Sequence, residues 1–134
     1  MNDCIFCKVI SKEVPGYFII DDKNVVAFLD IFGSVDGHVL VVPRKHGRTI
    51  QDFNKQELGE IMDTARIISL KMEKALGADS ITIGINHKEE KGVPHLHIHL
   101  IPRFKNDGGN FIQNVVKKGI KEDLSATASK IKAA

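Results

Sequence analysis

Short apolar runs alternate with polar interruptions in the first third of the chain, a pattern typical of β-strands joined by turns. Apolar runs at 17–20 and 25–30 flank the polar segment 21–24, and a third run at 38–42 stops at Pro43. The spacing predicts a hairpin followed by a third strand. We expect these strands to belong to an antiparallel sheet.

The apolar positions then change to a helical period. Asn54 and Glu57 have the spacing of a capping box, Phe53 and Leu58 can pack across the helix start, and Gly77 provides a stop. Between these signals an apolar stripe is formed by Leu58, Ile61, Met62, Ala65, Ile68 and Met72. This pattern predicts an amphipathic helix of about five turns that covers one face of the sheet.

The second half predicts two more strands, over 80–85 and 95–101, the latter bounded by Pro94 and Pro102. After Gly109, a short helix is predicted with Leu124, Ala128 and Ile131 on one side. The expected fold class is α+β, with an antiparallel five-stranded sheet, one long helix and a short C-terminal helix. A chain of 134 residues suits a single core, so we assign 1–104 to one domain and 105–134 to an extension packing on it.

Composition and charge exclude several classes of protein. Hydrophobic residues at 43% and charged residues at 27% are ordinary globular values, and a formal net charge of +2 gives no field that indicates nucleic acid as a partner. No apolar stretch reaches the roughly 18 residues of a membrane helix, and the N-terminus lacks a signal-peptide pattern. We therefore expect a cytoplasmic protein that binds neither nucleic acid nor a membrane.

Three of the six histidines, His95, His97 and His99, stand in strict alternation on one predicted strand. Alternate residues of a strand share a face and lie about 6.6 Å apart. A solvent-exposed polar face is the ordinary interpretation of a single histidine, but three in alternation favour shared chemistry. Imidazole ligates metals and acts as a nucleophile or acid–base group near neutral pH.

The segment His95–Ile101 resembles the signature of the histidine-triad family, His-x-His-x-His followed by two apolar residues. The resemblance spans residues 4–104 and includes the C-x-x-C start, Phe28-Leu29-Asp30, Gly37-His38 and Pro43-Arg44-Lys45-His46, while Pro102-Arg103 and Asp107-Gly108 are typical of its bacterial branch. It implies the HIT-like fold, a purine nucleotide substrate and a homodimer formed through the long helix and the fourth strand.

By this resemblance His97 is the nucleophile that attacks the α-phosphorus, which gives a nucleotidyl-histidine that water then hydrolyses. His95, His99 and His38 complete the implied catalytic cluster. His99, Asn86 and nearby backbone amides would stabilise charge on the phosphate oxygens. His38 has an alternative interpretation as a structural histidine that closes the turn after Gly37.

The resemblance also implies a nucleoside-binding region. Asp30 would accept hydrogen bonds from both ribose hydroxyls; the structural alternative is an aspartate that ends the strand and caps a turn. Ile5, Phe6, Phe28 and Ile31 would form an apolar slot for the base, and the same residues would also suit an ordinary core. Apolar contacts do not select adenine over guanine.

The two cysteines, Cys4 and Cys7, form a C-x-x-C pattern that indicates metal or redox chemistry. With His46 and His95 they make a tetrahedral set of two thiolates and two imidazoles, and these positions match the zinc ligands of zinc-containing family members. Redox motifs of this kind usually follow a strand and open a helix, whereas these cysteines stand at the N-terminus. We therefore favour a structural zinc site with no position open for substrate.

The segment 86–94 departs from the family pattern. Relatives carry a Gly-Gln-Ser/Thr segment that donates hydrogen bonds to phosphate, whereas this chain lacks the Gln and Ser/Thr and is about two residues shorter. Lys88 and Lys91 would supply positive charge that Glu89 and Glu90 partly cancel. The alternative is a solvated, charged turn without substrate contact.

Three functions remain open at this point. The first is a hydrolase or transferase that cleaves at the α-phosphate of nucleoside phosphoramidates or dinucleoside polyphosphates. The second is a nucleotide-binding regulatory module with little turnover. The third, a zinc-stabilised scaffold for a protein partner, accounts for the C-x-x-C pattern but leaves Asp30 and His97 unexplained.

Overall fold

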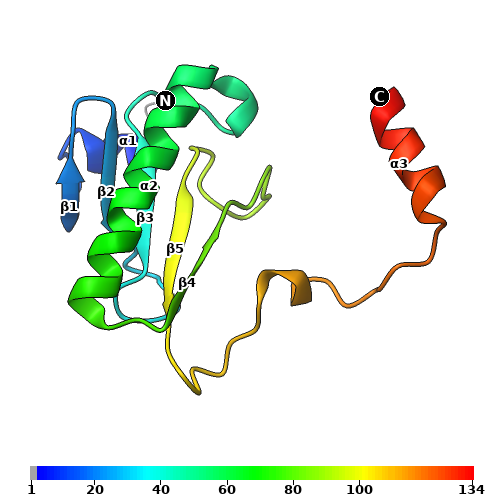
Figure 1. The fold of residues 1–134 in the computed structure, drawn as a ribbon. Helices are drawn as coiled ribbons and strands as arrows, with labels where there is room; N and C mark the ends of the chain where they lie inside the picture. Colours follow the sequence, from blue (N-terminus) through cyan, green and yellow to red (C-terminus); the bar gives the residue numbers. More distant parts are fainter. Residues whose placement is uncertain (1–2) are drawn as a thin grey trace.

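The computed structural model describes residues 3–134, which form an α+β fold as expected (Figure 1). Five strands form one antiparallel sheet in the order β1-β2-β3-β5-β4. The strands are β1 (Phe18–Asp21), β2 (Val25–Leu29), β3 (Val39–Pro43), β4 (Ser80–Gly84) and β5 (Ile98–Arg103), and the α-helices are α1 (Ile5–Ile10), α2 (Lys55–Leu76) and α3 (Leu124–Ala133).

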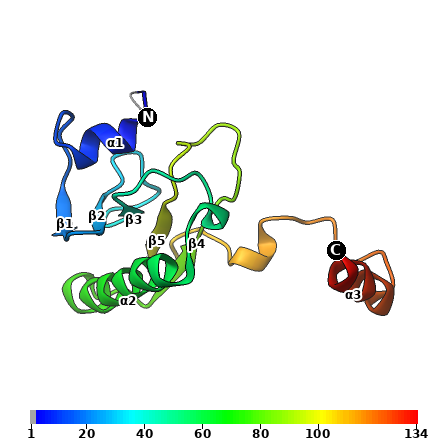
Figure 2. The same cartoon turned by 90° about the horizontal axis from the view of Figure 1, so that it is seen from above.

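Apolar side chains are buried on both faces of the sheet. Figure 2 shows α2 along one face and α1 near the other. The side chains packed toward α2 form the larger core, which includes Ala27, Val41, Leu96, Ile98, Leu100, Ile61, Ala65 and Ile68. A smaller core on the side of α1 includes Val26, Phe28, Leu40 and Val42. Because β2 and β3 are covered on both faces, they have continuous apolar runs instead of an alternating pattern.

The long helix has the predicted ends. The Asn54 side chain accepts a hydrogen bond from the Glu57 amide at 2.9 Å, and Glu57 accepts one from the Asn54 amide at 2.8 Å. Gly77 ends the helix with a φ of 64°, a left-handed conformation that favours glycine. The inclusion of Met62 in the buried stripe was wrong, since its side chain is 55% exposed. One helical step of about 100° from Ile61 takes it beyond the buried face.

The last strand differs from its predicted bounds at both ends. β5 begins at Ile98, so His95 and His97 lie in the preceding segment, where the Leu96 amide donates to the Gly47 carbonyl at 2.7 Å. The strand also continues through Pro102, which was expected to follow its end. Beyond Leu100 the strand pairs with β4 alone, and a proline is tolerated where a strand has a neighbour on one side only.

The two ends of the chain differ from the sequence prediction. Helix α1 was not predicted, and it begins after Cys4, whose sulfur accepts a hydrogen bond from the Cys7 amide. The C-terminal helix α3 forms near its predicted place, but it stands away from the sheet instead of packing on the same domain (Figure 1). Leu124 and Ile131 are 66% and 73% exposed. No helix within residues 3–134 is long and apolar enough to span a membrane.

Candidate functional site

The core determines where the histidines point. Leu96, Ile98 and Leu100 are buried against α2, and side-chain alternation therefore turns His95, His97 and His99 to the opposite side. This agrees with the expectation that the three rings share a face. His38 precedes β3, whose Leu40 pairs with His99, so a fourth imidazole lies beside the three.

His38 and His99 form a hydrogen-bonded pair whose proton positions follow from a backbone contact. The Ser34 amide donates to Nδ1 of His38 at 3.0 Å, so this nitrogen is the acceptor. Nε2 of His38 lies 2.9 Å from Nδ1 of His99. A neutral His38 therefore carries its proton on Nε2 and donates it to His99, which leaves the His99 proton on Nε2.

Nε2 of His99 is the one buried side-chain nitrogen or oxygen without a hydrogen-bond partner among residues 3–134. A buried N–H without an acceptor costs about 1–3 kcal/mol, so this donor is suited to a ligand. Burial lowers the pKa of His99, and His97 and His38 lower it further. Burial also lowers the pKa of His38, although Asp30 opposes this effect. Both rings are therefore neutral near pH 7.

The orientation of His97 leaves one ring nitrogen free. Nδ1 lies 2.7 Å from the carbonyl oxygen of His95, and because a carbonyl only accepts, Nδ1 carries the proton. In the neutral ring the lone pair is then on Nε2. The edge of Phe6 packs against the imidazole, with ring centroids 5.0 Å apart. The free nitrogen faces Glu89, whose Oε1 is 3.4 Å away.

Asp30 is placed for both of the roles considered for it. Its Oδ1 accepts a hydrogen bond from the Phe32 amide at 2.9 Å, which caps the turn after β2. Its Oδ2 lies 3.7 Å from Nε2 of His38. Asp30 and His38 both line a hollow of about 440 Å³ formed with the turn that joins β2 to β3. A ligand in this hollow would therefore reach both the Asp30 carboxylate and the ring of His38.

The expected base slot is only partly present. Phe28 is 4% exposed and packs between Phe6 and Phe18, with centroids 5.5 and 5.7 Å away. It therefore belongs to the smaller core, which was the alternative interpretation. Ile31 is 71% exposed at the rim of the hollow, and Ile5 is 42% exposed on α1. Asn86 is exposed after β4, and its side chain forms no hydrogen bond within residues 3–134.

Cys4, Cys7, His46 and His95 converge, as the sequence predicted, and their ligand atoms all lie within 4.8 Å of one another. Nδ1 of His95 is 3.5 Å from each sulfur, and Nδ1 of His46 is 3.3 Å from that of Cys7. Metal–sulfur and metal–nitrogen bonds of about 2.3 and 2.0–2.1 Å at tetrahedral angles separate such ligands by about 3.6 Å. The set therefore fits a metal ion.

The protonation of His95 also suits a ligand. Its Nε2 lies 2.7 Å from the Pro43 carbonyl oxygen, so Nε2 carries the proton and Nδ1 has the lone pair that faces the cysteines. Burial lowers the pKa of His95 to about 4. Burial also raises the pKa of the Cys7 thiol, with a further contribution from Cys4. One ring nitrogen of His95 therefore contacts the Pro43 carbonyl and the other faces the cysteines, so neither faces the proposed attacking nitrogen of His97.

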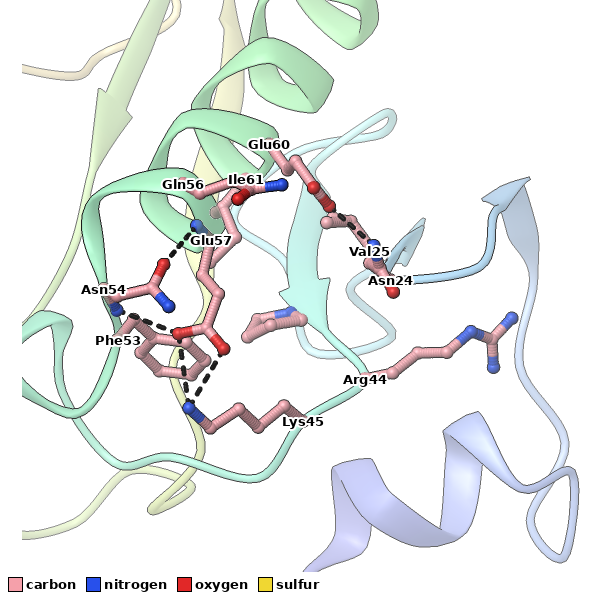
Figure 3. Close-up of a pocket in the computed structure, with 11 residues that line it drawn as sticks. Asn24, Val25, Arg44, Lys45, Phe53, Asn54, Gln56, Glu57, Glu60 and Ile61 are labelled. Atoms are coloured by element: carbon pink, nitrogen blue, oxygen red, sulfur yellow. Dashed lines mark hydrogen bonds and ion pairs between the residues drawn. The ribbon is translucent and has the colours of Figure 1, made fainter.

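A second hollow, of about 310 Å³, lies between the end of β3 and the start of α2 (Figure 3). Its polar groups bond to one another: Lys45 to Glu57 at 3.1 Å and Asn24 to Glu60 at 2.8 Å. Lys45 also lies 5.2 Å from the centroid of Phe53. The contacts of Lys45 hold the residue that precedes His46 against the start of α2.

Comparison with known proteins identifies the family. A family model for the HIT domain matches residues 11–106. The chain belongs to the HIT family. The HIT chain is 38% identical over 130 residues to an uncharacterized HIT-like protein of Borreliella burgdorferi, covering 92% of this chain and 88% of that protein. It is 34% identical over 108 residues to the adenosine 5'-monophosphoramidase HNT1 of Saccharomyces cerevisiae, covering 79% and 66%.

The HIT chain also resembles solved structures over nearly its full length. SMU.412c from Streptococcus mutans superposes with a TM-score of 0.84 at 30% identity, covering 99% of this chain and 83% of that one. The C-terminal extension, which stands away from the sheet, is thus included in the likeness.

Proposed function

We propose that this HIT protein cleaves at the α-phosphate of nucleoside phosphoramidates or dinucleoside polyphosphates, as a hydrolase or transferase, through a nucleotidyl-histidine on His97. The observation that carries the proposal is the hydrogen bond from Nδ1 of His97 to the His95 carbonyl. It assigns the lone pair to Nε2, and the His97 ring lies 4.9 Å, centroid to centroid, from the ring of His99 that carries the unpartnered donor. The monophosphoramidase activity named for the yeast relative supports this reaction class.

In the first step Nε2 of His97 attacks phosphorus, a bond from phosphorus to Nε2 forms, and the bond to the leaving group breaks, with a leaving amine taking up a proton from water. In the second step water attacks phosphorus and gives up a proton to the solvent, the bond to Nε2 breaks, and the nucleoside monophosphate is released. His99 would donate its Nε2 proton in a hydrogen bond to a phosphate oxygen or the leaving atom, with His38 holding its orientation. Asp30 would accept hydrogen bonds from the ribose.

We further propose that Cys4, Cys7, His46 and His95 bind a structural zinc ion. Zinc would supply no reaction chemistry there, because four protein ligands leave no position for substrate. Its proposed effect is to tie α1, the segment after β3 and the histidine segment together. His95 was considered both as a catalytic residue and as a metal ligand, and we propose that it acts as the ligand.

A homodimer completes the proposal. β4 is an edge strand, with Ile83 41% exposed, and α2 leaves Met62 and Leu70 each 55% exposed. Exposed apolar side chains beside an unpaired strand edge suit an interface between copies. This is the helix and strand surface that the family resemblance implies.

The alternative, a nucleotide-binding regulatory module with little turnover, is favoured by one observation. Glu89 places a carboxylate 3.4 Å from the proposed attacking nitrogen, which would oppose the approach of a phosphate. The two functions are separated by measuring turnover and nucleotide binding for the wild type and for His97→Asn.

The proposed function predicts that His97→Asn abolishes turnover of adenosine and guanosine phosphoramidates while nucleotide binding changes by a few-fold at most. Retention of even a tenth of the wild-type rate would overturn it, because a tenfold loss is only about 1.4 kcal/mol of barrier. A wild type that binds nucleotide but turns over no substrate would support the regulatory module.

A further inference from the structure

The segment between β4 and β5 brings a negative charge to the proposed nucleophile. Oε1 of Glu89 lies 3.4 Å from Nε2 of His97, and the Glu89 side chain is 26% exposed. Within residues 3–134, Glu89 lies within 4.0 Å of no other basic side-chain nitrogen, and the contact becomes an ion pair only when His97 is protonated. Lys88 and Lys91, which were expected to supply positive charge here, are exposed and form no ion pair within the same residues.

Gly92 provides the space for this arrangement. A Cβ atom built on Gly92 would lie 1.7 Å from Oε1 of Glu89 and 1.9 Å from its carboxyl carbon. The Glu89 side chain therefore lies directly over the backbone of Gly92. Because the obstructing atoms belong to the end of a flexible side chain, an alanine here would displace the carboxylate more readily than the backbone.

A series of contacts through three histidines links Asp30 to Glu89. From Asp30, the series runs 3.7 Å to His38 and a further 2.9 Å to His99. The rings of His99 and His97 are 4.9 Å apart between centroids, and Glu89 follows at 3.4 Å. A nucleotide with its ribose at Asp30 would have its α-phosphate near His99 and in front of Nε2 of His97. In an in-line displacement the leaving group departs from the side of phosphorus opposite Nε2, and the Glu89 carboxylate, which faces Nε2, borders that side.

A reacting phosphorus comes within about 3.5 Å of the attacking nitrogen, which is the space that the Glu89 carboxylate borders. The carboxylate must move aside when substrate binds, but the short segment keeps it near the leaving group. Charges a few ångströms apart at a partly buried site interact strongly enough to alter relative rates. The Glu89 carboxylate would repel a leaving group with several negative charges. It would tolerate a neutral leaving group and attract a cationic one.

We infer that Glu89 is a specificity-determining residue that selects phosphoramidates with neutral or cationic amine leaving groups over substrates with polyanionic leaving groups, such as dinucleoside polyphosphates. This inference rests on the proposed function and narrows its substrate class. It also gives the segment 86–94, which departs from the family pattern in the sequence, a role in the choice of leaving group.

The test uses adenosine 5'-phosphoramidates of three amines of equal length that end in an ammonium, a methyl or a carboxylate group, together with a diadenosine polyphosphate. The readout is the ratio of kcat/KM for the ammonium and carboxylate substrates. Glu89→Gln should lower this ratio about tenfold, which corresponds to about 1.4 kcal/mol, and should raise the relative rate with the diadenosine polyphosphate. The matched control is Glu90→Gln, which removes the same charge from the exposed neighbour.

A second variant, Gly92→Ala, displaces the carboxylate without removing it and should shift the ratio in the same direction as Glu89→Gln. A ratio that stays within about twofold in Glu89→Gln, or that Glu90→Gln lowers equally, overturns the inference. Failure of the proposed function gives a different result, because His97→Asn would then retain turnover. Turnover that depends on His97 but shows no charge preference overturns the role of Glu89 alone.

Discussion

The carbonyl oxygen of His95 accepts a hydrogen bond from Nδ1 of His97 at 2.7 Å. His95 thus connects two clusters, since its ring faces Cys4 and Cys7 while its main chain orients the ring of His97. Packing reinforces this arrangement because Leu96, between the two histidines, is 2% exposed in the larger core. A displacement of His95 would therefore be transmitted to the proposed nucleophile.

The metal proposal predicts about one zinc per chain in protein kept reduced. Cys4→Ser should lower the melting temperature more than it lowers activity measured below the melting point, because a closed site stabilises structure and takes no part in the reaction. Chelator-treated wild type is the control, and it should resemble the variant. Metal analysis that finds no zinc, or a Cys4→Ser protein with unchanged melting temperature, would contradict the proposal.

The hydrogen bond between His38 and His99 predicts that substitution of His38 lowers kcat, although His38 itself does not attack phosphorus. His38→Gln removes the imidazole that receives the Ser34 amide and orients His99, so kcat should fall about a hundredfold with a smaller change in KM. Thermal unfolding serves as the control for folding. An unchanged kcat in a folded variant would assign His38 the purely structural role.

The second oxygen of Asp30 predicts ribose selectivity. Asp30→Asn should weaken the binding of ribonucleotides roughly tenfold, because hydrogen bonds to a charged acceptor contribute about 1.5–3 kcal/mol. The 2'-deoxy analogues, which lack one of the two donors, should be affected less. Calorimetry with matched ribo and deoxy nucleotides measures both effects, and equal weakening of the two would remove the ribose contact from the account.

The buried histidines predict a loss of stability in mild acid. Burial lowers the pKa of His38 and His99 below the value of about 6.5 in the unfolded chain. The unfolded chain therefore binds more protons than the native one as the pH falls below about 6.5, and the free energy of unfolding decreases.

Urea denaturation of the wild type should accordingly give a lower free energy of unfolding at about pH 5.5 than at about pH 7.5. The double variant His38→Gln, His99→Gln should show a smaller difference between the two values. Carboxyl groups with lowered pKa, such as Asp107 beside Arg103, titrate at lower pH in both proteins. An equal pH dependence in the two proteins would be inconsistent with neutral, buried histidines.

Several elements could be predicted from sequence because their signals are local. The ends of α2 follow from Asn54, Glu57 and Gly77, which act on backbone groups within one turn. The common orientation of the three histidines follows from the alternation of Leu96, Ile98 and Leu100. The position of Met62 was less predictable, because the edge of an apolar stripe depends on what packs beside it.

Other features depend on contacts between distant segments. The environment of Phe28 is set by Phe6 and Phe18, and the approach of Glu89 to His97 depends on the space that Gly92 leaves for the Glu89 side chain. The contact between Glu89 and His97 could not be predicted from the positions of these residues in the sequence. The run of charged residues at 88–91 is equally typical of a solvated turn.

The central claim is that His97 forms a covalent bond to phosphorus, and trapping that species tests it most directly. Wild type mixed with an adenosine phosphoramidate and quenched at alkaline pH should show, by intact-protein mass spectrometry, the added mass of one adenosine monophosphate moiety, which peptide mapping places on His97. His97→Asn should show no adduct under the same conditions. The absence of an adduct in wild type during steady turnover, or an adduct that persists in His97→Asn, would contradict the account.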